Sequence, residues 1–313
     1  MPAAFASAPT NTPEIWLQRM NLALRNLNYE GTFVYIRADH LETMHIAHRA
    51  DDKGGIERLI SLTGPKREVI RDHQEVKCIL PESHSVLVER RYTTTYFPAV
   101  MPAAMHAGAL AAHYTFKDLG EGRIAGYKCH IISIEPRDGY RYGYRLWLDA
   151  RTAMLLRSDL LAEDGQTVER VMFTSLAYPK HIPSAALKAT EIEPGYTWNS
   201  QGDPEKPRSN DKSVSWKATR LPPGFALARS DVQRVAGVAH PVRHLVYSDG
   251  LTSVSVFAQA TASAHKFLIG PSHMGAVNAF GRWVGDRHIT VIGEVPLATV
   301  ELIAESMQPE QNP

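Results

Sequence analysis

Residues 140–161 read YRYGYRLWLDARTAMLLRSDLL and decide the fold class of this chain. One side of a strand through this stretch would carry Tyr140, Tyr142, Tyr144, Leu146 and Leu148, and the other Arg141, Gly143, Arg145, Trp147 and Asp149. Strict alternation with many aromatic residues predicts a β-strand rather than a helix. Polar turns follow at 149–152 and 163–166, and the second contains Asp-Gly, a strong hairpin signal. Three consecutive antiparallel strands are therefore expected here.

The sequence before this hairpin predicts one helix and then more strands. Thr12, Pro13 and Glu14 form a helix start, and apolar residues recur at helical spacing from Trp16 to Leu27. Strand-like runs separated by polar turns follow at 31–37, 41–49, 56–62, 68–71, 76–80, 85–92, 114–119 and 127–135. Such regular spacing predicts a large antiparallel sheet that is curled or barrel-like. Many of these strands carry apolar groups on both faces, so we expect a helix, a ligand cavity or a partner to cover the second face.

The pattern breaks at two places and divides the chain. Residues 97–113 contain prolines, alanines and methionines and predict a connecting helix or a mobile lid. Residues 193–213 are rich in Pro, Gly, Ser, Asn and charge, which is typical of a domain boundary. Beyond them we expect a hairpin around 244–257, a strand at 287–294 and a helix that starts at Pro296. The fold is thus predicted to be mixed α+β, mainly antiparallel β, with a large domain at 12–192, a linker at 193–213 and a small α+β domain at 214–313.

Length and charge restrict the class of protein. A chain of 313 residues favours two domains, and a formal charge of +1 gives no field that would attract nucleic acid. No apolar run approaches the ~18 residues that a membrane span needs. The first ten residues, MPAAFASAPT, are of the kind found around a signal-peptidase site. They lack a charged start and an apolar core, so any export signal is expected to precede this sequence or to have been removed.

No set of residues in the sequence predicts catalysis or a metal site. Common nucleophile, phosphate-loop and dinucleotide motifs are absent. His45 and His48 have an odd separation and would point to opposite faces of a strand, so they cannot share a metal. His240 and His244 would lie ~13 Å apart along a strand. Neither an enzyme nor a cofactor is therefore expected.

The two cysteines leave two readings open. Cys78 and Cys129 form no CxxC motif, which excludes a zinc ribbon or a thioredoxin-type site. They are either two buried thiols or, in an oxidising compartment, a disulfide between strands. The disulfide requires the two Cα atoms to lie within about 7 Å of each other.

The central hairpin and several other stretches together resemble one family. RDGYRYGYRLWLDARTAMLLRSDLLAEDGQTVERVMF is similar to the corresponding part of the RseB/MucB proteins, periplasmic negative regulators of the envelope-stress sigma factor. Further similar stretches are LNYEGTFVYI, GPKREVIRD, LPPGFALARS, LVYSDGLTSVSVF and ITVIGEVPLATVELIAES. The resemblance extends from about Trp16 to Ser306, and the number and order of the stretches make it specific.

This resemblance implies a fold and a function. The large domain would be an unclosed β-barrel similar to the lipoprotein carriers LolA and LolB, with the small domain docked beside it. The protein would lie in the periplasm and bind the periplasmic segment of a membrane-spanning anti-sigma factor of the RseA/MucA type. It would thereby shield that factor from the first, DegS-type protease, in the sigma-E stress response. Lipid, such as lipopolysaccharide or a lipoprotein acyl chain, would enter the concave domain and release the complex; self-association into a homo-oligomer is left open.

Two groups of residues are candidates for these contacts. The candidates for a lipid cavity are the aromatic and methionine side chains Phe33, Tyr35, Met44, Tyr96, Met101, Met105, Trp147 and Met154. The candidates for contact with the anti-sigma factor are Trp198, Tyr247, Asp249 and Phe257. Core packing is the competing explanation for the first group, because aromatic residues of strands are usually buried. The second group was chosen by position and by the frequency of aromatic residues at interfaces.

Two other functions compete with the regulator. A periplasmic lipid or lipoprotein carrier would use the same large domain but would have no evident use for the small one. An enzyme acting on envelope lipids would need a nucleophile or an acid pair beside the cavity, and the sequence shows neither. Loss of anti-sigma binding on deletion of residues 214–313, with lipid binding retained, would separate the regulator from the carrier.

Overall fold

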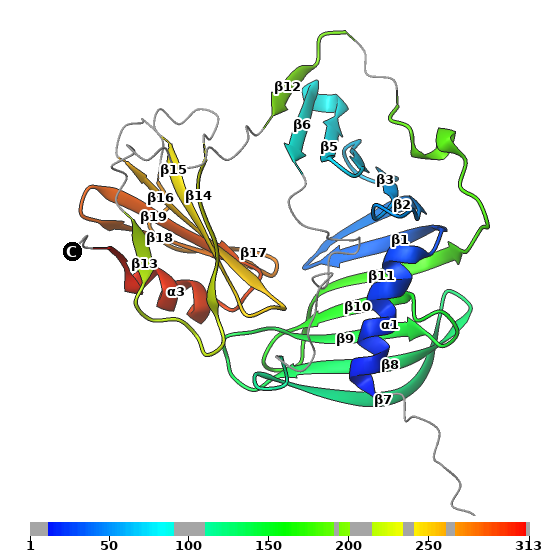
Figure 1. Cartoon of the computed structure of the whole chain (residues 1–313), viewed down its shortest axis with the longest axis horizontal. Helices are drawn as coiled ribbons and strands as arrows, with labels where there is room; N and C mark the ends of the chain where they lie inside the picture. The colour runs from blue at the N-terminus through cyan, green and yellow to red at the C-terminus, as the bar shows by residue number, and fades with distance from the viewer. Residues whose placement is uncertain are drawn as a thin grey trace, which may run out of the picture.

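A computed structural model describes residues 12–90, 110–190, 194–200, 215–233, 241–260 and 267–310 of the chain. Their strands form a sheet of twelve strands, a sheet of six strands and a short two-stranded ribbon. Figure 1 shows the large sheet curving around the side that faces the small sheet. No helix among the described residues is long and apolar enough to cross a membrane.

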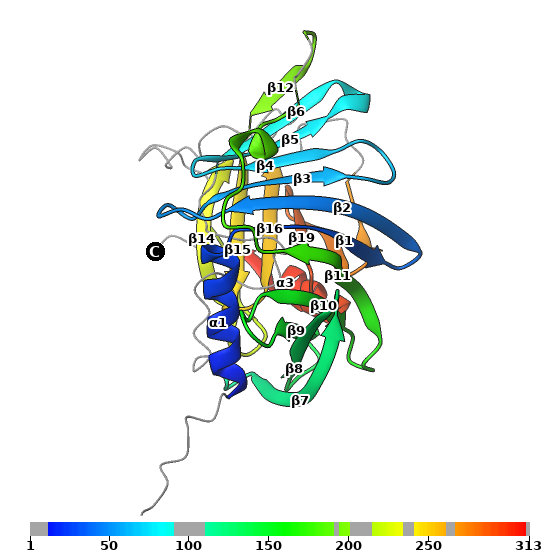
Figure 2. The same ribbon diagram turned by 90° about the vertical axis from the view of Figure 1, so that its right-hand side faces the viewer.

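The large sheet is open, as expected. Its strands are β1 (Tyr29–Arg37), β2 (His40–Arg49), β3 (Ile56–Ser61), β4 (Glu68–Arg71), β5 (Glu75–Leu80), β6 (Ser85–Arg90), β7 (Tyr114–Ile124), β8 (Tyr127–Pro136), β9 (Gly143–Asp149), β10 (Leu155–Leu161), β11 (Thr167–Ala177) and β12 (Thr197–Ser200). They lie in the order β12-β6-β5-β4-β3-β2-β1-β11-β10-β9-β8-β7, which Figure 2 shows from top to bottom. Every pair is antiparallel except β12 with β6, and the two end strands, β12 and β7, are not paired with each other in the described part of the chain. The predicted unclosed barrel is therefore confirmed.

The central hairpin is confirmed except at its start. We predicted a strand from Tyr140, but β9 begins at Gly143. The Asp138 carboxylate accepts the backbone N–H of Tyr140 at 3.0 Å, which closes a turn and keeps residues 140–142 out of the sheet. Arg141 therefore lies in the loop between β8 and β9, where its side chain is free to leave the sheet.

The predicted first helix is α1 (Pro13–Asn26), followed by Leu27 as its C-cap. It runs past the strands β1, β11, β10, β9, β8 and β7, which are consecutive in the sheet (Figures 1 and 2). Its buried side chains are Trp16, Leu17, Met20, Ala23 and Leu24. They join the main hydrophobic core, where the Trp16 ring lies 4.3 Å from that of His130. Each such large apolar side chain stabilises the fold by about 1.5–3 kcal/mol when fully buried.

The small domain is a six-stranded antiparallel sheet with one helix. Its elements are β13 (Trp216–Ala218), β14 (Ala226–Gln233), β15 (Val242–Ser248), β16 (Ser253–Ala260), β17 (Gly270–Met274), β18 (Val277–Val284), β19 (Arg287–Gly293), α3 (Leu297–Ser306) and β20 (Met307–Pro309). The sheet order is β14-β15-β16-β19-β18-β17, and β13 pairs with β20. Val256, Val291, Val300 and Ile303 belong to its core. The predicted helix after Pro296 is confirmed.

Both cysteines are free thiols in the structure. Cys78 lies half-buried on β5, and Cys129 is buried on β8, eight positions away in the strand order of the sheet. Burial raises the pKa of each thiol. The structure therefore agrees with the first alternative, two thiols, and shows no disulfide between Cys78 and Cys129.

Candidate functional site

A hollow of about 440 Å³ lies on the concave side of the large sheet. It is lined by Phe33, Tyr35, Met44, Leu59, Arg67, Val69, Arg71, Cys78, Ser158, Leu160, Glu169, Arg170, Val171 and Glu294. Three of the predicted lipid-cavity residues, Phe33, Tyr35 and Met44, are therefore brought together here. Phe33 packs edge-on against Phe173 at 5.7 Å, Met44 on β2 is its direct cross-strand partner, and Tyr35 lies two residues further along β1. The hollow is a candidate ligand site because it is concave, mostly apolar and carries a few polar groups.

The structure does not bring the other predicted lipid-cavity residues to this hollow. Trp147 is opposite Ile131 and Arg157 in the sheet register, one residue out of phase with the row that includes Leu146 and Ser158. Side chains alternate between the two faces of a strand, so Trp147 lies on the other face, where the Arg157 guanidinium stacks on its ring at 3.9 Å. The expectation that one cavity gathers all these residues is thereby corrected.

The remaining lipid-cavity candidates are buried elsewhere or not described. Met154 is fully buried directly before β10, in the main hydrophobic core, and does not line the hollow. For it the competing explanation, core packing, applies. Tyr96, Met101 and Met105, together with most of the predicted lid at 97–113, lie outside the described residues.

The polar groups of the hollow have a clear arrangement. Arg67 and Arg71 lie on the β4 side, each paired with a carboxylate, at 2.7 Å from Glu42 and Glu57 respectively. The opposite side carries Glu169 on β11, and Glu294 reaches the hollow from the small domain, directly after β19. An amphiphile in this hollow would therefore find positive charge near β4, an apolar middle, and negative charge where the two domains meet.

Burial and the carboxylate of Glu169 raise the pKa of two groups at the domain boundary. Burial, and then the like charge of Glu169, raise the pKa of Glu294. Burial also raises the pKa of the Tyr35 hydroxyl far above its ordinary value, and the hydrogen bond to Glu169 adds to this effect. Tyr35 is therefore a permanent hydrogen-bond donor at this end of the hollow.

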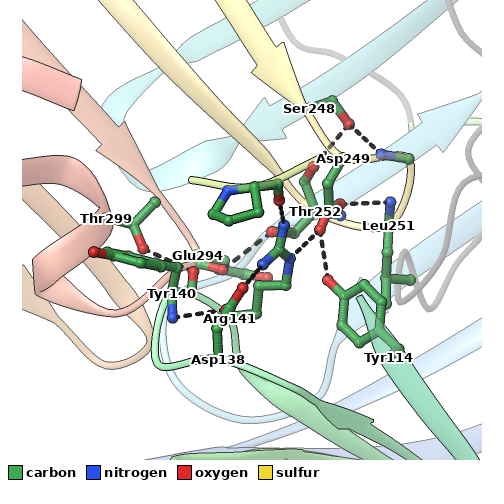
Figure 3. Close-up of polar contacts among 12 residues, drawn as sticks. Tyr114, Asp138, Tyr140, Arg141, Ser248, Asp249, Leu251, Thr252, Glu294 and Thr299 are labelled. Carbon is green, nitrogen blue, oxygen red and sulfur yellow. Dashed lines mark hydrogen bonds and ion pairs between the residues drawn. The ribbon is translucent and has the colours of Figure 1, made fainter. Parts of the chain in front are cut away.

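The contact between the two domains is centred on one buried arginine (Figure 3). Arg141 has a fully buried side chain, whose Nε donates to Asp249 Oδ2 at 2.6 Å. Its two terminal nitrogens contact the Asp138 carboxylate and the carbonyl oxygen of Pro223. The guanidinium also lies 5.0 Å from the ring of Phe225. A guanidinium is suited to this position because its planar fork can satisfy several acceptors at once.

Asp249 is the matching group on the small domain. Its Oδ2 accepts the hydroxyl of Tyr114 at 2.7 Å in addition to Arg141, and its Oδ1 accepts the backbone N–H groups of Leu251 and Thr252, each at 2.9 Å. The carboxylate thus shapes the β15–β16 turn and receives two donors from the large domain. We call Tyr114, Asp138, Arg141 and Asp249 the interdomain latch.

Two hairpin tips of the small domain enter the core of the large domain. Leu251, at the β15–β16 tip, and Ala276, at the β17–β18 tip, are buried members of the main hydrophobic core. Around them, Thr299 Oγ1 donates to the carbonyl of Tyr140 at 2.7 Å, and Asn278 Nδ2 donates to the Tyr142 hydroxyl at 3.1 Å. The interface therefore combines apolar burial with satisfied polar groups, as a stable docking surface requires.

The predicted partner-binding residues have different environments. Trp198 lies on β12 and is 55% exposed, so its side chain is available to a partner. Phe257 is half-buried and stacks on His244 with ring centroids 4.5 Å apart. Tyr247 is buried, its hydroxyl accepting the N–H of Ala218 at 2.9 Å. Because Tyr247 and the latch residue Asp249 are enclosed within this protein, the expectation that they are surface contacts is corrected.

Sequence reasoning missed the residues that hold the domains together. Arg141 was assigned to a strand face, Tyr114 was predicted only as the start of a strand, and Asp138 was given no role. The one available signal was the polar turn at 248–250, which follows a strand-like run and contains the Asp249 carboxylate. A turn aspartate is usually explained by local turn chemistry alone, so nothing in the sequence indicated its partner in the other domain.

Two features related to catalysis can be compared with the described residues: a metal-binding cluster and a triad-like arrangement around a serine. No group of three or more His, Cys, Asp or Glu side chains in this part of the chain could hold a metal ion. His244 Nε2 lies 3.1 Å from Ser255 Oγ, and its Nδ1 lies 3.6 Å from Asp231 Oδ1, in the order of a catalytic triad. Ser255 is on β16, however, between β15 and β19, where neighbouring backbone N–H groups serve the sheet ladder and are not free to stabilise an oxyanion.

Comparisons with known proteins match both halves of the chain. A family model described as the MucB/RseB N-terminal domain matches residues 12–191, and one described as the MucB/RseB C-terminal domain matches 210–308. The sigma factor AlgU regulatory protein MucB of Pseudomonas aeruginosa is 34% identical over 302 residues, 94% of this chain and 90% of that protein. The sigma-E factor regulatory protein RseB of Escherichia coli K12 is 29% identical over 296 residues, 93% of this chain and 89% of that protein.

Solved structures show the same relationship. The MucA/MucB complex of Pseudomonas aeruginosa contains a chain that is 32% identical to this one, with a TM-score of 0.73 and coverage of 96% of this chain and 99% of that chain. A structure of MucB in complex with MucA(peri) gives 31% identity, a TM-score of 0.72 and coverage of 96% and 100%. The similarity therefore includes both domains and is not confined to the open sheet.

Proposed function

Since this chain belongs to the MucB/RseB family, we propose that it is a periplasmic negative regulator of a sigma factor of the sigma-E/AlgU type. Its partner would be the periplasmic segment of a membrane anti-sigma factor of the MucA type. The observation that carries this proposal is the match of both domains to MucB chains that were solved as complexes with MucA. The family that the sequence stretches resemble is the same as the family whose models match the chain.

The regulator would act by occupying its partner. A bound anti-sigma segment is withheld from a DegS-type protease, because a protease needs an extended and accessible stretch of chain. Trp198 is a candidate contact, since it is a large apolar side chain that is 55% exposed within the predicted linker. Exposed tryptophans of this kind are enriched among the residues that dominate binding energy.

Lipid would be the opposing ligand, and the hollow supports this part of the proposal. Its volume of about 440 Å³ lies within the roughly 300–1,000 Å³ that is typical of ligand pockets. Apolar walls from Phe33, Leu59 and Val69 suit an acyl chain, and Arg67 at the rim suits an anionic headgroup such as a phosphate. Lipopolysaccharide and lipoprotein acyl chains both have this chemistry.

The two ligands would compete through the arrangement of the domains. A ligand shifts a conformational equilibrium only by its differential affinity for the two states. Glu294 of the small domain lines the hollow, so the docked and undocked arrangements present different sites to a lipid. We propose that the anti-sigma segment binds the docked arrangement more tightly and that lipid favours the undocked one.

The first test is binding of the purified periplasmic segment of the cognate anti-sigma factor to the full chain. We expect saturable binding, protection of the segment from a DegS-type protease, and loss of both on addition of lipopolysaccharide fragments. Trp198→Ala should weaken binding, with Leu22→Ala as a matched control because Leu22 is a 57% exposed apolar residue on α1. Absence of binding by the wild-type chain would refute the regulatory function.

The second test follows the hollow directly. Cys78 lines it and is half-buried, whereas Cys129 is fully buried, so a maleimide reagent should label Cys78 and spare Cys129 in the folded chain. Lipid in the hollow should slow the labelling of Cys78. Unchanged labelling at saturating lipid would refute the hollow as the lipid site.

A periplasmic lipid or lipoprotein carrier is the second candidate, and the same hollow favours it. The two functions differ in their requirement for the small domain. Protection of Cys78 by lipid without any binding of the anti-sigma segment would favour the carrier.

A further inference from the structure

Glu169 takes part both in the wall of the hollow and in the docking of the small domain. It lies on β11 and is only 8% exposed. One of its carboxylate oxygens accepts the Tyr35 hydroxyl at 2.8 Å, within the hollow. The other accepts the backbone N–H of Ala276, from the small domain, at 3.2 Å. A single carboxylate therefore joins a ligand-lining residue to the tip of the β17–β18 hairpin.

The hairpin tip fits closely against the large domain. Gly275 has a φ of +62°, and a Cβ placed there would lie 2.2 Å from Cδ of Arg37 and 3.1 Å from Oε1 of Glu169. Only glycine allows this approach, because any side chain would meet β1 and β11. The tip is thus seated by shape, and the Ala276 amide is directed at Glu169 as a result.

The electrostatics of this contact depend on water in the hollow. Glu169 and Glu294 both line it, carry like charge and reach it from different domains. An acyl chain that extended along Leu160 and Val171 would exclude water from both carboxylates. Burying a carboxylate without sufficient hydrogen bonds is strongly unfavourable. Separation of the domains would relieve this cost, since it would return solvent to Glu169 and remove Glu294.

We infer that Glu169 couples occupancy of the hollow to the docking of the small domain. An anionic single-chain amphiphile, with its headgroup near Arg67 and its chain directed toward β11, would release the β17–β18 tip through this residue. The inference rests on the proposed lipid binding and adds the coupling residue and the hairpin that responds. Coupling of this kind is reciprocal, so docking must weaken amphiphile binding by the same factor.

The experiment measures docking and occupancy on the same full-length sample. Hydrogen exchange of residues 270–284 reports docking, since the acceptor of the Ala276 amide belongs to the other domain. Maleimide labelling of Cys78 reports occupancy. The probe is monomeric lysophosphatidylglycerol. For the wild-type chain we expect saturating probe to protect Cys78 and to accelerate exchange at 270–284 by about 5–150-fold, the usual range of allosteric coupling.

Variants identify the residue responsible. Glu169→Gln keeps the size of the side chain and removes its charge, so the probe should still protect Cys78 but should accelerate exchange less than about 2-fold. Glu121→Gln, on an exposed position of β7, is the matched control and should behave as the wild type. If residues 270–284 of Glu169→Gln exchange without probe as fast as those of the probe-bound wild type, the Glu169 carboxylate holds the docked state. In that case Glu294→Gln must show a smaller acceleration of exchange by the probe than the wild type does.

The outcomes separate this inference from the proposed function. Protection of Cys78 in the wild type without faster exchange at 270–284 would overturn the coupling while lipid binding stands. Equal acceleration of exchange in the wild type, Glu169→Gln and Glu294→Gln would overturn the role of Glu169 alone. Unprotected Cys78 would overturn the lipid site and the coupling together.

Discussion

Replacing Arg141 with methionine is the sharpest test of how the two domains are held together. The substitution preserves much of the apolar length of the side chain and removes the guanidinium that contacts Asp138, Asp249 and Pro223. Breaking a buried ion pair by removing one partner typically costs about 3–5 kcal/mol. Asp249 retains the Tyr114 hydroxyl and two backbone N–H donors, so we expect the lower end, about 3 kcal/mol.

This cost would appear chiefly as weaker docking. A loss of about 3 kcal/mol reduces the ratio of docked to undocked chains by roughly two orders of magnitude. Hydrogen exchange of the Ala276 amide at the β17–β18 tip and at the β15–β16 tip should accelerate by that factor, while the strands of the six-stranded sheet keep their protection. Arg151→Met is the matched control, because Arg151 is an exposed arginine in the β9–β10 turn and surface substitutions usually change stability by less than about 0.5 kcal/mol.

A second variant separates the ion pair from the surrounding contacts. Tyr114→Phe removes one hydrogen bond to the same carboxylate and should cost about 1.5–3 kcal/mol, as bonds to charged groups do. The two substitutions share Asp249, so their effects should not be additive in a double-mutant cycle. Wild-type exchange at both hairpin tips in the Arg141→Met chain would refute the conclusion that the latch holds the domains.

The remaining predictions concern the boundary and the outer face. Gly224→Ala should weaken docking by more than the ~1–2 kcal/mol penalty of a left-handed backbone, because φ is +82° and the new Cβ would also lie 2.2 Å from His113 Nε2. Adding His113→Ala should restore all of the lost docking except that backbone penalty, as measured by hydrogen exchange at the hairpin tips. The pKa of Glu294 is raised in the docked state, so the docked state binds protons more tightly than the undocked one. Docking should therefore be strongest at low pH and weaken as the pH rises from the ordinary carboxyl pKa through the raised one. Glu294→Gln should flatten the pH dependence of hydrogen exchange at the hairpin tips, and an unchanged slope would contradict this. Trp147→Ala should lower the free energy of unfolding by about 3–5 kcal/mol in urea, yet leave the protection of Cys78 by lipid unchanged, because its ring lies on the face away from the hollow.

The latch and the hairpin tips explain why the small domain matters to the proposed function. Leu251 and Ala276 belong to the hydrophobic core of the large domain, so undocking exposes apolar surface on both sides. In the proposed mechanism the protein has two arrangements, with docking favoured by these buried contacts and opposed by the carboxylates at the hollow. A regulator that responds to lipid requires such a balance, whereas a simple carrier does not.

Local features of the sequence were sufficient to predict the elements of this fold. Period-two alternation identified β9, β10 and β11, the Thr12-Pro13 pair identified the start of α1, and Pro296 marked the start of α3. These signals depend on residues a few positions apart, and the backbone geometry that they report is local. Apolar groups on both strand faces also indicated that something covers the inner face, and Phe33, Tyr35 and Met44, three of the eight predicted lipid-cavity residues, line the hollow.

Only the tertiary structure decided which distant residues meet. Arg141 and Asp249 are 108 positions apart, and Glu169 and Ala276 are 107 apart. No periodicity relates such positions, because the docking of one domain on another depends on the curvature of the large sheet and the shape of two hairpin tips. Side-chain alternation places Trp147 on the face opposite Leu146, but which face of the large sheet carries the hollow was decided only by the tertiary structure. The sequence by itself thus determined the strands and helices, while the hollow, the latch and the carboxylate that links them exist only in the folded protein.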